Sequence, residues 1–466
     1  MTNYRYVCFV TPSNARSLLY PARILPQAYS FRTTIGRGAY ILVMNIHFVG
    51  INGVSMRALA DLAASRGHNV TGSDRSNGDH DAKNVVGCDL VVYTNAVPPD
   101  NCELVAARRL GIPTVERATY LGELSRSFKK TIAVAGCHGK STATAMLGKA
   151  FAAEKPTVHV GVAGGSTLGG RSLFITEACE YNKSFLHLRP DLGIVLNLGY
   201  DHPDCYTDGA AVERAFSEFC AASRRALVNG DDARCRSLCK NTITFGLDKR
   251  NDYRAEDIKS ENGCRSFSFV TPKRRAAINL SVAGGHNVYN ALAALAAADV
   301  MGASASAAIK GVNGFDGIPR RFERKCIAYG KTVLTDYAHH PDEITATIKL
   351  AREIFPSVAV VFQPHTYSRT RALLNEFADA LENADTVLLA PIFPARETAD
   401  LGVSSGDIAK LLREKGKRAY CFDTMPEIVL ACKTLKEKAV IFMGAGDIDK
   451  AADRLAERAK ADGEWL

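Results

Sequence analysis

The sequence predicts an α/β protein of several domains, each built on a largely parallel sheet. From Met44 onward, short runs of β-branched residues alternate with alanine-rich stretches, and this alternation is typical of strand-helix units. With 466 residues, the chain is also longer than a single hydrophobic core usually organises. Several strand-like runs end in glycine or polar turns, which is where open α/β sheets gather their ligand groups.

The first expected domain covers residues 44–130. It opens with a strand beginning at Asn45 that runs into the turn Gly50-Ile-Asn-Gly53 and then into a helix. Asp74 follows about twenty residues after this turn, at a distance from which a carboxylate can reach a ribose. An ordinary packing turn explains these glycines equally well. A later strand of this domain ends before the turn that contains Asn95.

The second expected domain covers residues 131–319 and begins with a strand followed by Gly136-Cys-His-Gly-Lys140-Ser141 and a helix. A strand that feeds a glycine loop and then a helix presents backbone N–H groups to an anion. Lys140 supplies a positive charge, and Ser141 supplies a hydroxyl for Mg²⁺. The loop departs from G-x-x-x-x-G-K-[ST] because Val134 stands where the first glycine is expected. A phosphate-binding loop is favoured over a tight turn with a solvated lysine.

Two acidic clusters in this domain also follow strand-like runs. Glu177 comes after an apolar stretch and is suited to hold Mg²⁺ directly or through water, while Asp201-His202 follows the run beginning at Leu192. A hydrogen-bonded turn is the alternative reading of Asp201-His202. We expect residues 243–280 to form a smaller inserted sheet, followed by a helix from Gly285.

The third expected domain covers residues 320–466 and repeats the strand-helix alternation, after a glycine-rich linker predicted at residues 311–321. Its strand-like runs begin near Thr332, Val358, Asp385 and Ala439. Polar clusters follow the first two strands, and their histidines and arginines suit phosphate or carboxylate recognition. These clusters contain Asp336, His339, His340, His365, Tyr367, Arg369 and Arg371.

Bulk composition narrows the class of protein. The formal charge of +9 rests partly on residues 1–43, which hold five arginines and no Lys, Asp or Glu, so that the remainder carries +4. This excess is too small and too dispersed for a nucleic-acid-binding protein. Thirteen cysteines without a C-x-x-C pair indicate reduced thiols. No apolar run reaches the roughly 18 residues of a membrane span, so we expect a soluble protein.

Residues 1–43 form an expected N-terminal extension or an upstream-start artefact, because the first clean strand follows Met44. An organellar transit peptide is the alternative interpretation of this arginine-bearing, acid-free segment.

The motifs together resemble the Mur ligases of peptidoglycan synthesis, over nearly the whole stretch from Met44 to Gly446. Family loops read G-T-x-G-K-[TS], which is similar to Gly136–Ser141 and accounts for the missing first glycine. The other matching motifs are His47-Phe-Val-Gly-Ile-Asn-Gly53, Thr94-Asn-Ala-Val-Pro, Glu177-Ala-Cys-Glu180, Ser184-Phe-Leu-His-Leu-Arg-Pro190, Asp201-His202, Gly285-His-Asn-Val-Tyr-Asn290-Ala, Pro319-Arg-Arg-Phe322, Asp336-Tyr-Ala-His-His-Pro341-Asp-Glu343-Ile and Phe362-Gln-Pro-His365-Thr-Tyr-Ser-Arg369-Thr-Arg371.

The resemblance implies a three-domain architecture: a Rossmann-like N-terminal domain for the UDP sugar, a central P-loop ATPase domain and a Rossmann-like C-terminal domain. Within the family, the motifs are most similar to members that join L-alanine to UDP-N-acetylmuramate. The implied reaction uses ATP and Mg²⁺, and passes through an acyl phosphate. It also implies a cytoplasmic enzyme of cell-wall biogenesis, with consequences for cell shape, division and the cell cycle. We expect no nucleic-acid or membrane partner, and a monomer or weak homodimer.

The resemblance assigns roles residue by residue. Direct roles in the reaction fall to Lys140, His202, Arg321 and His339. The ATP-binding set is Gly136, Cys137, His138, Gly139, Lys140, Ser141, Thr142, Asn287, Asn290, Arg321 and Asp336. The set that binds the UDP sugar and the amino acid is Gly50, Asn52, Gly53, Asp74, Asn95, His365, Tyr367, Arg369 and Arg371. The metal ligands are Ser141, Glu177 and His202.

The sequence also departs from the family pattern at three acidic positions. Cys179 and Asn182 stand where the family commonly has acids in E-A-D-E-S-D, and Gly199 replaces the acid of N-I-E-x-D-H. Fewer negative charges around Mg²⁺ are expected to weaken its binding or alter substrate handling. Two alternatives therefore stay open: a ligase that recycles whole peptides, and a catalytically reduced nucleotide-binding Mur-like protein.

Overall fold

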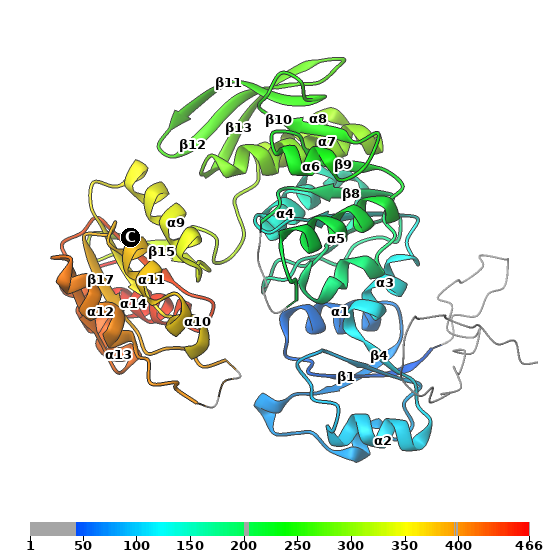
Figure 1. The fold of residues 1–466 in the computed structure, drawn as a ribbon, viewed down its shortest axis with the longest axis horizontal. Coiled ribbons are helices and arrows are strands. Elements are labelled where there is room, and N and C mark those ends of the chain that lie inside the picture. Colours follow the sequence, from blue (N-terminus) through cyan, green and yellow to red (C-terminus); the bar gives the residue numbers. More distant parts are fainter. Residues whose placement is uncertain (1–42, 200–204, 396, 398, 466) are drawn as a thin grey trace, which may run out of the picture.

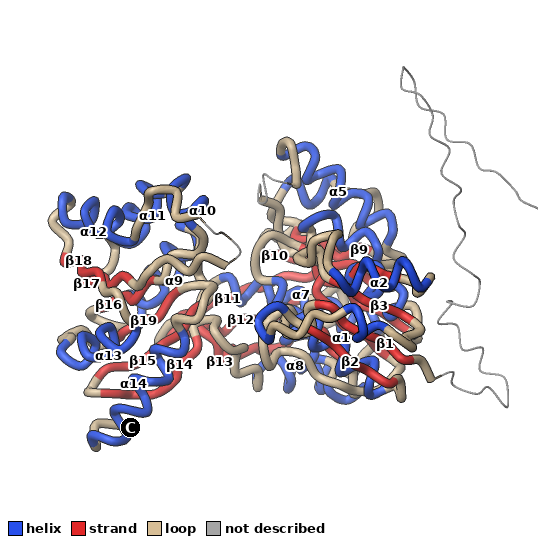
Figure 2. The backbone as a smooth tube through the Cα atoms, turned by 90° about the horizontal axis from the view of Figure 1, so that it is seen from below, coloured by secondary structure: helices blue, strands red, loops and turns tan. Residues whose placement is uncertain are grey.

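Three sheets follow one another along the chain, each covered by its own helices (Figure 1). The computed structural model describes residues 43–199, 205–395, 397 and 399–465. Figure 2 shows the strands running through the interior of each part, with helices around them. None of the helices in these ranges combines the length and apolar character needed to cross a lipid bilayer.

The N-terminal sheet has four parallel strands in the order β2-β1-β3-β4. The central strand β1 is buried at every position after its first residue, because its apolar run packs between two strands and the helices above and below. The strands are β1 (Asn45–Val49), β2 (Asn69–Ser73), β3 (Leu90–Tyr93) and β4 (Thr114–Glu116). The helices are α1 (Val54–Ser65), α2 (Cys102–Leu110) and α3 (Arg117–Ser125).

The middle sheet has nine strands in the order β13-β12-β11-β10-β9-β8-β5-β7-β6. Its strands are β5 (Lys130–Ala135), β6 (Thr157–His159), β7 (Leu173–Glu177), β8 (Leu192–Val195), β9 (Ala226–Asn229), β10 (Ile243–Gly246), β11 (Tyr253–Glu261), β12 (Cys264–Val270) and β13 (Arg275–Ala283). Its helices are α4 (Lys140–Ala150), α5 (Gly209–Ala222), α6 (Ala233–Ser237), α7 (His286–Met301) and α8 (Ala305–Asn313).

The prediction of a separate inserted sheet over residues 243–280 was wrong. β10 pairs in parallel with β9 on one side and with β11 on the other, so β11, β12 and β13 extend the central sheet. The predicted linker at residues 311–321 also began too early, because α8 continues to Asn313. Gly311 serves helix packing instead, since a Cβ there would lie 2.1 Å from the Lys149 carbonyl oxygen.

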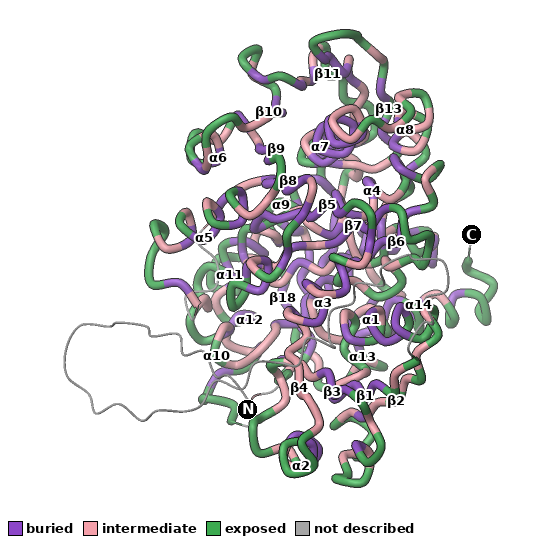
Figure 3. The backbone as a smooth tube through the Cα atoms, turned by 90° about the vertical axis from the view of Figure 1, so that its right-hand side faces the viewer, coloured by how far each residue is buried: buried purple, intermediate pink, exposed green. Residues whose placement is uncertain are grey.

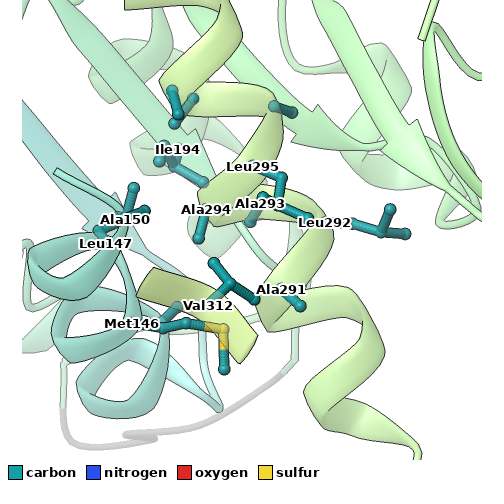
Figure 4. Close-up of a cluster of buried hydrophobic side chains, with 14 of the residues drawn as sticks. Met146, Leu147, Ala150, Ile194, Ala291, Leu292, Ala293, Ala294, Leu295 and Val312 are labelled. Carbon is teal, nitrogen blue, oxygen red and sulfur yellow. The ribbon is translucent and has the colours of Figure 1, made fainter. Parts of the chain in front are cut away.

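The core of the middle domain centres on α7, which is apolar on nearly all sides. Leu292 and its neighbours on α7 pack against α4 and α8, and Figure 4 shows Met146, Leu147 and Val312 facing them. Figure 3 shows α7 as a largely buried helix. A helix that is apolar all round needs partners on every side, and here the sheet and the two helices provide them. α7 therefore fixes its own N-terminus, and the polar side chains on it, relative to the sheet.

The C-terminal sheet has six strands in the order β14-β15-β19-β16-β17-β18. All pairs are parallel except β14 with β15, an antiparallel edge that the strand-helix alternation did not predict. The strands are β14 (Glu323–Ala328), β15 (Lys331–Asp336), β16 (Val358–Phe362), β17 (Thr386–Leu389), β18 (Arg418–Cys421) and β19 (Ala439–Met443). The helices are α9 (Pro341–Ile354), α10 (Tyr367–Ala372), α11 (Leu374–Leu381), α12 (Ser405–Glu414), α13 (Met425–Thr434) and α14 (Asp449–Asp462).

Truncation of the α7 core tests this packing. Leu292 is 0% exposed, so Leu292→Ala is expected to lower the free energy of unfolding by about 2–5 kcal/mol, through lost apolar burial and the cavity left behind. Leu430→Ala is the control, because Leu430 is 57% exposed and should change stability by less than about 0.5 kcal/mol. Chemical denaturation of both variants measures the difference, and equal losses would contradict the packing described.

Candidate functional site

The loop between β5 and α4 lies beyond the carboxyl end of a central strand. Gly139 closes the loop in the left-handed region (φ 83°), and α4 begins at Lys140 with no side-chain cap and no acid in its first turn. The first N–H groups of α4 therefore face the loop without a competing carboxylate, which favours an anion there. Asn290 limits the space on the other side, since a Cβ on Gly139 would lie 2.9 Å from its Oδ1.

Lys140 folds back over this loop. Its Nζ donates hydrogen bonds to the carbonyl oxygens of Gly136 and Cys137 and pairs with Glu180 Oε1 at 2.9 Å. Burial acts to lower the pKa of Lys140, but the Glu180 carboxylate outweighs this effect and the pKa is raised. Lys140 is therefore a charged group held against the loop. Glu180 belongs to a motif that the sequence singled out, but its role as partner of the lysine was not predicted.

Asn197 braces the same loop, a role that sequence reasoning missed. Its Oδ1 accepts the His138 N–H at 2.9 Å, and its Nδ2 donates to the His138 carbonyl at 3.0 Å. Cys137 and Gly199 form a second brace, with the Gly199 N–H 2.9 Å from the Cys137 sulfur and that thiol 3.1 Å from the Gly199 carbonyl. The signal for Asn197 was its position at the end of a buried strand adjacent to β5.

Glu177 ends β7, the strand that neighbours β5 on its other side. Its Oε1 accepts the Gly161 N–H at 2.8 Å. Ser141 is buried in the first turn of α4. Within the described residues, no group of three or more His, Cys, Asp or Glu side chains is arranged to hold a metal ion. His202 and Asp201 lie outside the described residues.

The N-terminus of α7 brings two buried amides to the loop. Asn290 Nδ2 donates to Asn287 Oδ1 at 2.9 Å, and Asn287 Nδ2 donates to the Ala283 carbonyl at 2.6 Å. The asparagine pair is held in one orientation because each amide donates to a fixed acceptor. Asn290 contacts the loop at Gly139. The expectation that Asn287 and Asn290 face the adenine or metal side of ATP stays a prediction.

A cavity of about 780 Å³ joins the middle and C-terminal domains beside this loop. Its wall on one side comes from the loop and α4, and on the other side from the segment after α8 and from α9. The predicted site residues that line it are His138, Gly139, Ser141, Thr142, Asn287, Arg321 and Asp336. This volume falls in the range typical of nucleotide-sized ligand pockets.

Arg321 and Asp336 contribute to the cavity from the C-terminal side. The Arg321 guanidinium lies 5.4 Å from the centre of the Tyr337 ring, in a cation–π contact. Asp336 ends β15, and its carboxylate accepts the N–H groups of Phe322 at 2.7 Å and Ala338 at 2.8 Å. Burial raises the pKa of Asp336, against the opposing effect of Arg321. Asp336 therefore fixes the backbone at Phe322 and at Ala338, and it also lines the cavity.

His339 and His365 come together from different strand ends, with ring centres 6.0 Å apart. Burial lowers the pKa of both, that of His365 to about 4, and Arg369 acts in the same direction on both, while Glu343 opposes the shift of His339. His365 Nδ1 and Arg369 Nη1 are buried and have no hydrogen-bond partner among the described residues. The Tyr367 N–H donates to Glu397 at 2.6 Å, and Arg371 is exposed.

The five N-terminal site residues lie at neighbouring turns but do not line this cavity. Asp74 Oδ2 accepts the Asn52 N–H at 3.0 Å, so its carboxylate holds the glycine turn in shape. Gly50 has a left-handed φ of 88°, which favours glycine. It also packs against the turn that contains Asn95, since a Cβ on Gly50 would lie 2.8 Å from the Thr94 side chain. Gly53 caps α1.

The glycine turn is tied to the middle domain through the start of α1. Ser55 Oγ lies 3.1 Å from His159 Nε2, and His159 Nδ1 lies 3.1 Å from Thr176 Oγ1, next to Glu177. Burial lowers the pKa of His159 to about 4, and Arg117 adds to the effect, so this imidazole is neutral at pH 7. A line of hydrogen-bonded side chains therefore runs from the turn to the end of β7.

Three protein-family models match the chain in the order of its domains. They are described as "Mur ligase family, catalytic domain" (residues 45–129), "Mur ligase middle domain" (residues 134–298) and "Mur ligase, glutamate ligase domain" (residues 320–446). The chain is 38% identical over 450 residues to the UDP-N-acetylmuramate–L-alanine ligase of Caldanaerobacter subterraneus, covering 89% of this chain and 98% of that relative. The chain belongs to the Mur ligase family. A second Mur ligase, the UDP-N-acetylmuramate–L-alanine ligase of Lachnospira eligens, is 40% identical over 449 residues and covers 88% and 98% of the two chains.

Solved Mur ligase structures share the fold. The UDP-N-acetylmuramate-alanine ligase of Thermotoga maritima superposes with a TM-score of 0.78 at 30% identity, covering 90% of this chain and all of that one. A murein peptide ligase of Psychrobacter arcticus reaches a TM-score of 0.63 at 24% identity, covering 88% and 98%. The second likeness concerns the fold alone. The three-domain Mur ligase architecture is therefore confirmed for this chain, from the Rossmann-like first sheet to the C-terminal domain.

A methyl group at Gly139 tests the loop geometry. Gly139→Ala combines a strained left-handed backbone with a contact to Asn290, so ATP-dependent turnover should fall strongly. Gly302→Ala is the matched control, because Gly302 has a φ of 80° with nothing near its Cβ position. Both variants should lose about 1 kcal/mol of stability from backbone strain. An ATP titration in which both variants lose binding, or in which both keep it, would contradict the loop geometry described at Gly139.

Proposed function

We propose that this Mur ligase joins L-alanine to the lactyl carboxylate of UDP-N-acetylmuramate at the expense of ATP. A carboxylate oxygen attacks the γ-phosphorus, ADP leaves, and an acyl phosphate forms. The neutral amine of L-alanine then attacks the acyl carbon, and phosphate leaves from the tetrahedral intermediate as the nitrogen loses its proton. The principal support is the shared cavity, which brings the phosphate loop of one domain to Arg321 and Asp336 of another.

The phosphate loop supports the first step. The N–H groups at the start of α4 and the Lys140 ammonium suit the β- and γ-phosphates, since phosphoryl transfer depends mostly on positioning and charge neutralisation. Arg321 faces the same cavity from the C-terminal domain, where it can reach the transferred phosphoryl group. Asn287, Asn290 and Asp336 are assigned to the adenosine side or the metal side of the nucleotide.

The residues near the loop suit Mg²⁺. Ser141 offers a hydroxyl oxygen and Glu177 a carboxylate, which are the hard oxygen ligands that this ion prefers, and His202 is assigned to a second ion by resemblance. Mg²⁺ bound here would neutralise charge on the phosphates. Glu177 is oriented by the Gly161 N–H, which its Oε1 accepts.

The amino acid is assigned to the histidine and arginine cluster of the C-terminal domain. The buried, unsatisfied polar atoms of His365 and Arg369 suit the carboxylate of L-alanine, because a buried donor without a partner is costly. His339, Tyr367 and Arg371 are assigned to the surrounding pocket. The UDP sugar is assigned to Gly50, Asn52, Gly53, Asp74 and Asn95, from which hydrogen-bonded side chains lead toward Glu177.

Several wider features complete the proposal. Residues 44–130, 131–319 and 320–466 form the three functional domains, and the expectation for residues 1–43 lies outside the described residues apart from Val43. The enzyme works in the cytoplasm as a monomer or weak homodimer, with no nucleic-acid or membrane partner, and its product enters cell-wall biogenesis, cell division and the cell cycle.

The alternative is the ligase that recycles whole peptides, whose overall plan resembles that of the L-alanine ligases. Product formation with L-alanine and with a tripeptide, each offered with UDP-N-acetylmuramate and ATP, separates the two. We expect L-alanine to be joined and the tripeptide to be ignored. Joining of the tripeptide alone would reverse the assignment, and ATP binding without either product would indicate a catalytically reduced protein.

Replacement of the loop lysine tests the chemistry. Lys140→Ala is expected to reduce kcat roughly 10²- to 10³-fold, by analogy with the removal of one preorganised charge donor. Lys149→Ala is the matched control on the same helix, because its side chain is 53% exposed and pairs only with the exposed Asp316. Phosphate release with L-alanine measures both variants. Equal activity of Lys140→Ala and wild type would refute the proposed role of the loop.

A further inference from the structure

Helix α9 forms one wall of the nucleotide cavity. Its start is fixed by the sequence: His340 caps the helix and accepts the Asp342 N–H, and Pro341 occupies the first position. One face of α9 lines the cavity along the helix, through Asp342, Glu343, Ala346, Thr347, Leu350 and Ile354. The two ends of α9 therefore meet the middle domain at different places.

Glu343, in the first turn of α9, contacts groups from two domains. Its Oε1 lies 3.7 Å from His138 Nδ1 in the phosphate loop. Its Oε2 lies 3.4 Å from His339 Nδ1 and accepts the His339 N–H at 3.1 Å. One carboxylate thus links the loop beside Lys140 to the histidine cluster assigned to the amino acid. Glu343 belongs to the motif that begins at Asp336, but the sequence assigned it no role.

The surroundings keep Glu343 ionised. Burial acts to raise its pKa, but His339, Arg321 and His138 outweigh burial, and the pKa of Glu343 is lowered. Asp336 is an acidic group close enough for Glu343 to act on it, and Glu343 adds to the raised pKa of Asp336. A carboxylate that is only 20% exposed and surrounded by three cationic or protonatable groups is suited to hold those groups in fixed positions.

We propose that Glu343 is a positioning residue that holds His339 and the phosphate loop in register across the domain interface. The proposal rests on the function proposed above. The acyl phosphate forms beside the loop and the amine arrives beside His339, so the second step requires the two sides to be aligned at near-contact distance. His339 contacts Glu343 through its backbone and its ring, and the His339 ring also makes an edge-on contact with His365.

A second contact on the same helix provides an internal comparison. Near the end of α9, Glu353 pairs with Arg265 of β12 at 2.8 Å, and Ile354 packs so close to Gly263 that a Cβ there would lie 2.6 Å from its side chain. This contact also joins the two domains, but it lies at the other end of α9 from Glu343. Glu353 therefore reports interdomain docking without touching the groups that Glu343 aligns.

Kinetics of Glu343→Gln, Glu343→Asp and Glu353→Gln test the proposal. Glu343→Gln keeps an oxygen for the His339 N–H but removes the charge. We expect it to raise KM for L-alanine and lower kcat together, reducing kcat/KM for L-alanine by about 5- to 50-fold, with a smaller change in KM for ATP and an unchanged melting temperature. Glu343→Asp keeps the charge and should recover part of the loss. Glu353→Gln should leave kcat and KM for L-alanine near wild type.

Each result decides between the possibilities. Equal effects of Glu343→Gln and Glu353→Gln, or a loss in Glu343→Gln that follows its melting temperature, would overturn the positioning role. A wild-type enzyme that forms no product from L-alanine would instead contradict the proposed function. In a double-mutant cycle, Glu343→Gln combined with His138→Gln should lose less kcat/KM than the sum of the single changes, and strict additivity would also overturn the proposal.

Discussion

The buried cation at the loop between β5 and α4 is the interaction on which the site depends. Lys140 lies against two backbone carbonyl groups and Glu180, and its side chain is 15% exposed. A charge in this position is tolerated only because its partners are fixed, and the neighbouring strands fix them. Glu177 ends β7 and Glu180 follows it, while Asn197 follows β8, and both strands pair with β5. α7, held by its apolar packing, delivers Asn287 and Asn290.

The sequence predicted the elements that have a strong local pattern. The apolar strands beside the loop, α7 and four of the five parallel strands of the C-terminal domain were confirmed, because burial on both faces leaves an unbroken apolar run. The joining of β10 to β9 and the antiparallel pairing of β14 were not predictable in the same way. Strand order and edge pairing depend on contacts between distant segments, and the polar residues 243–280 carry no signal for their neighbours.

Prediction of the candidate site was similarly uneven. Lys140, Ser141 and Glu177 follow strand ends, and the parallel sheet brings them to one edge. Asn197 and Glu343 were missed because their importance lies in contacts across 59 residues of chain in one case and across a domain interface in the other. Of the three departures from the family's acidic residues, those at Asn182 and Gly199 have a structural explanation, and that at Cys179 has none. Gly199 and Cys137 contact each other directly, and Asn182 adopts a left-handed conformation (φ 51°) that asparagine tolerates better than most residues.

A crystal structure of the enzyme with a non-hydrolysable ATP analogue and Mg²⁺ would test the central claim most directly. We expect the β- and γ-phosphates to accept hydrogen bonds from the N–H groups of residues 137–142. The Lys140 ammonium should turn toward them, and Arg321 should approach them from the C-terminal domain. The nucleoside should occupy the cavity of about 780 Å³. An analogue bound elsewhere, or a Lys140–Glu180 pair unchanged beside an empty loop at saturating analogue, would contradict it.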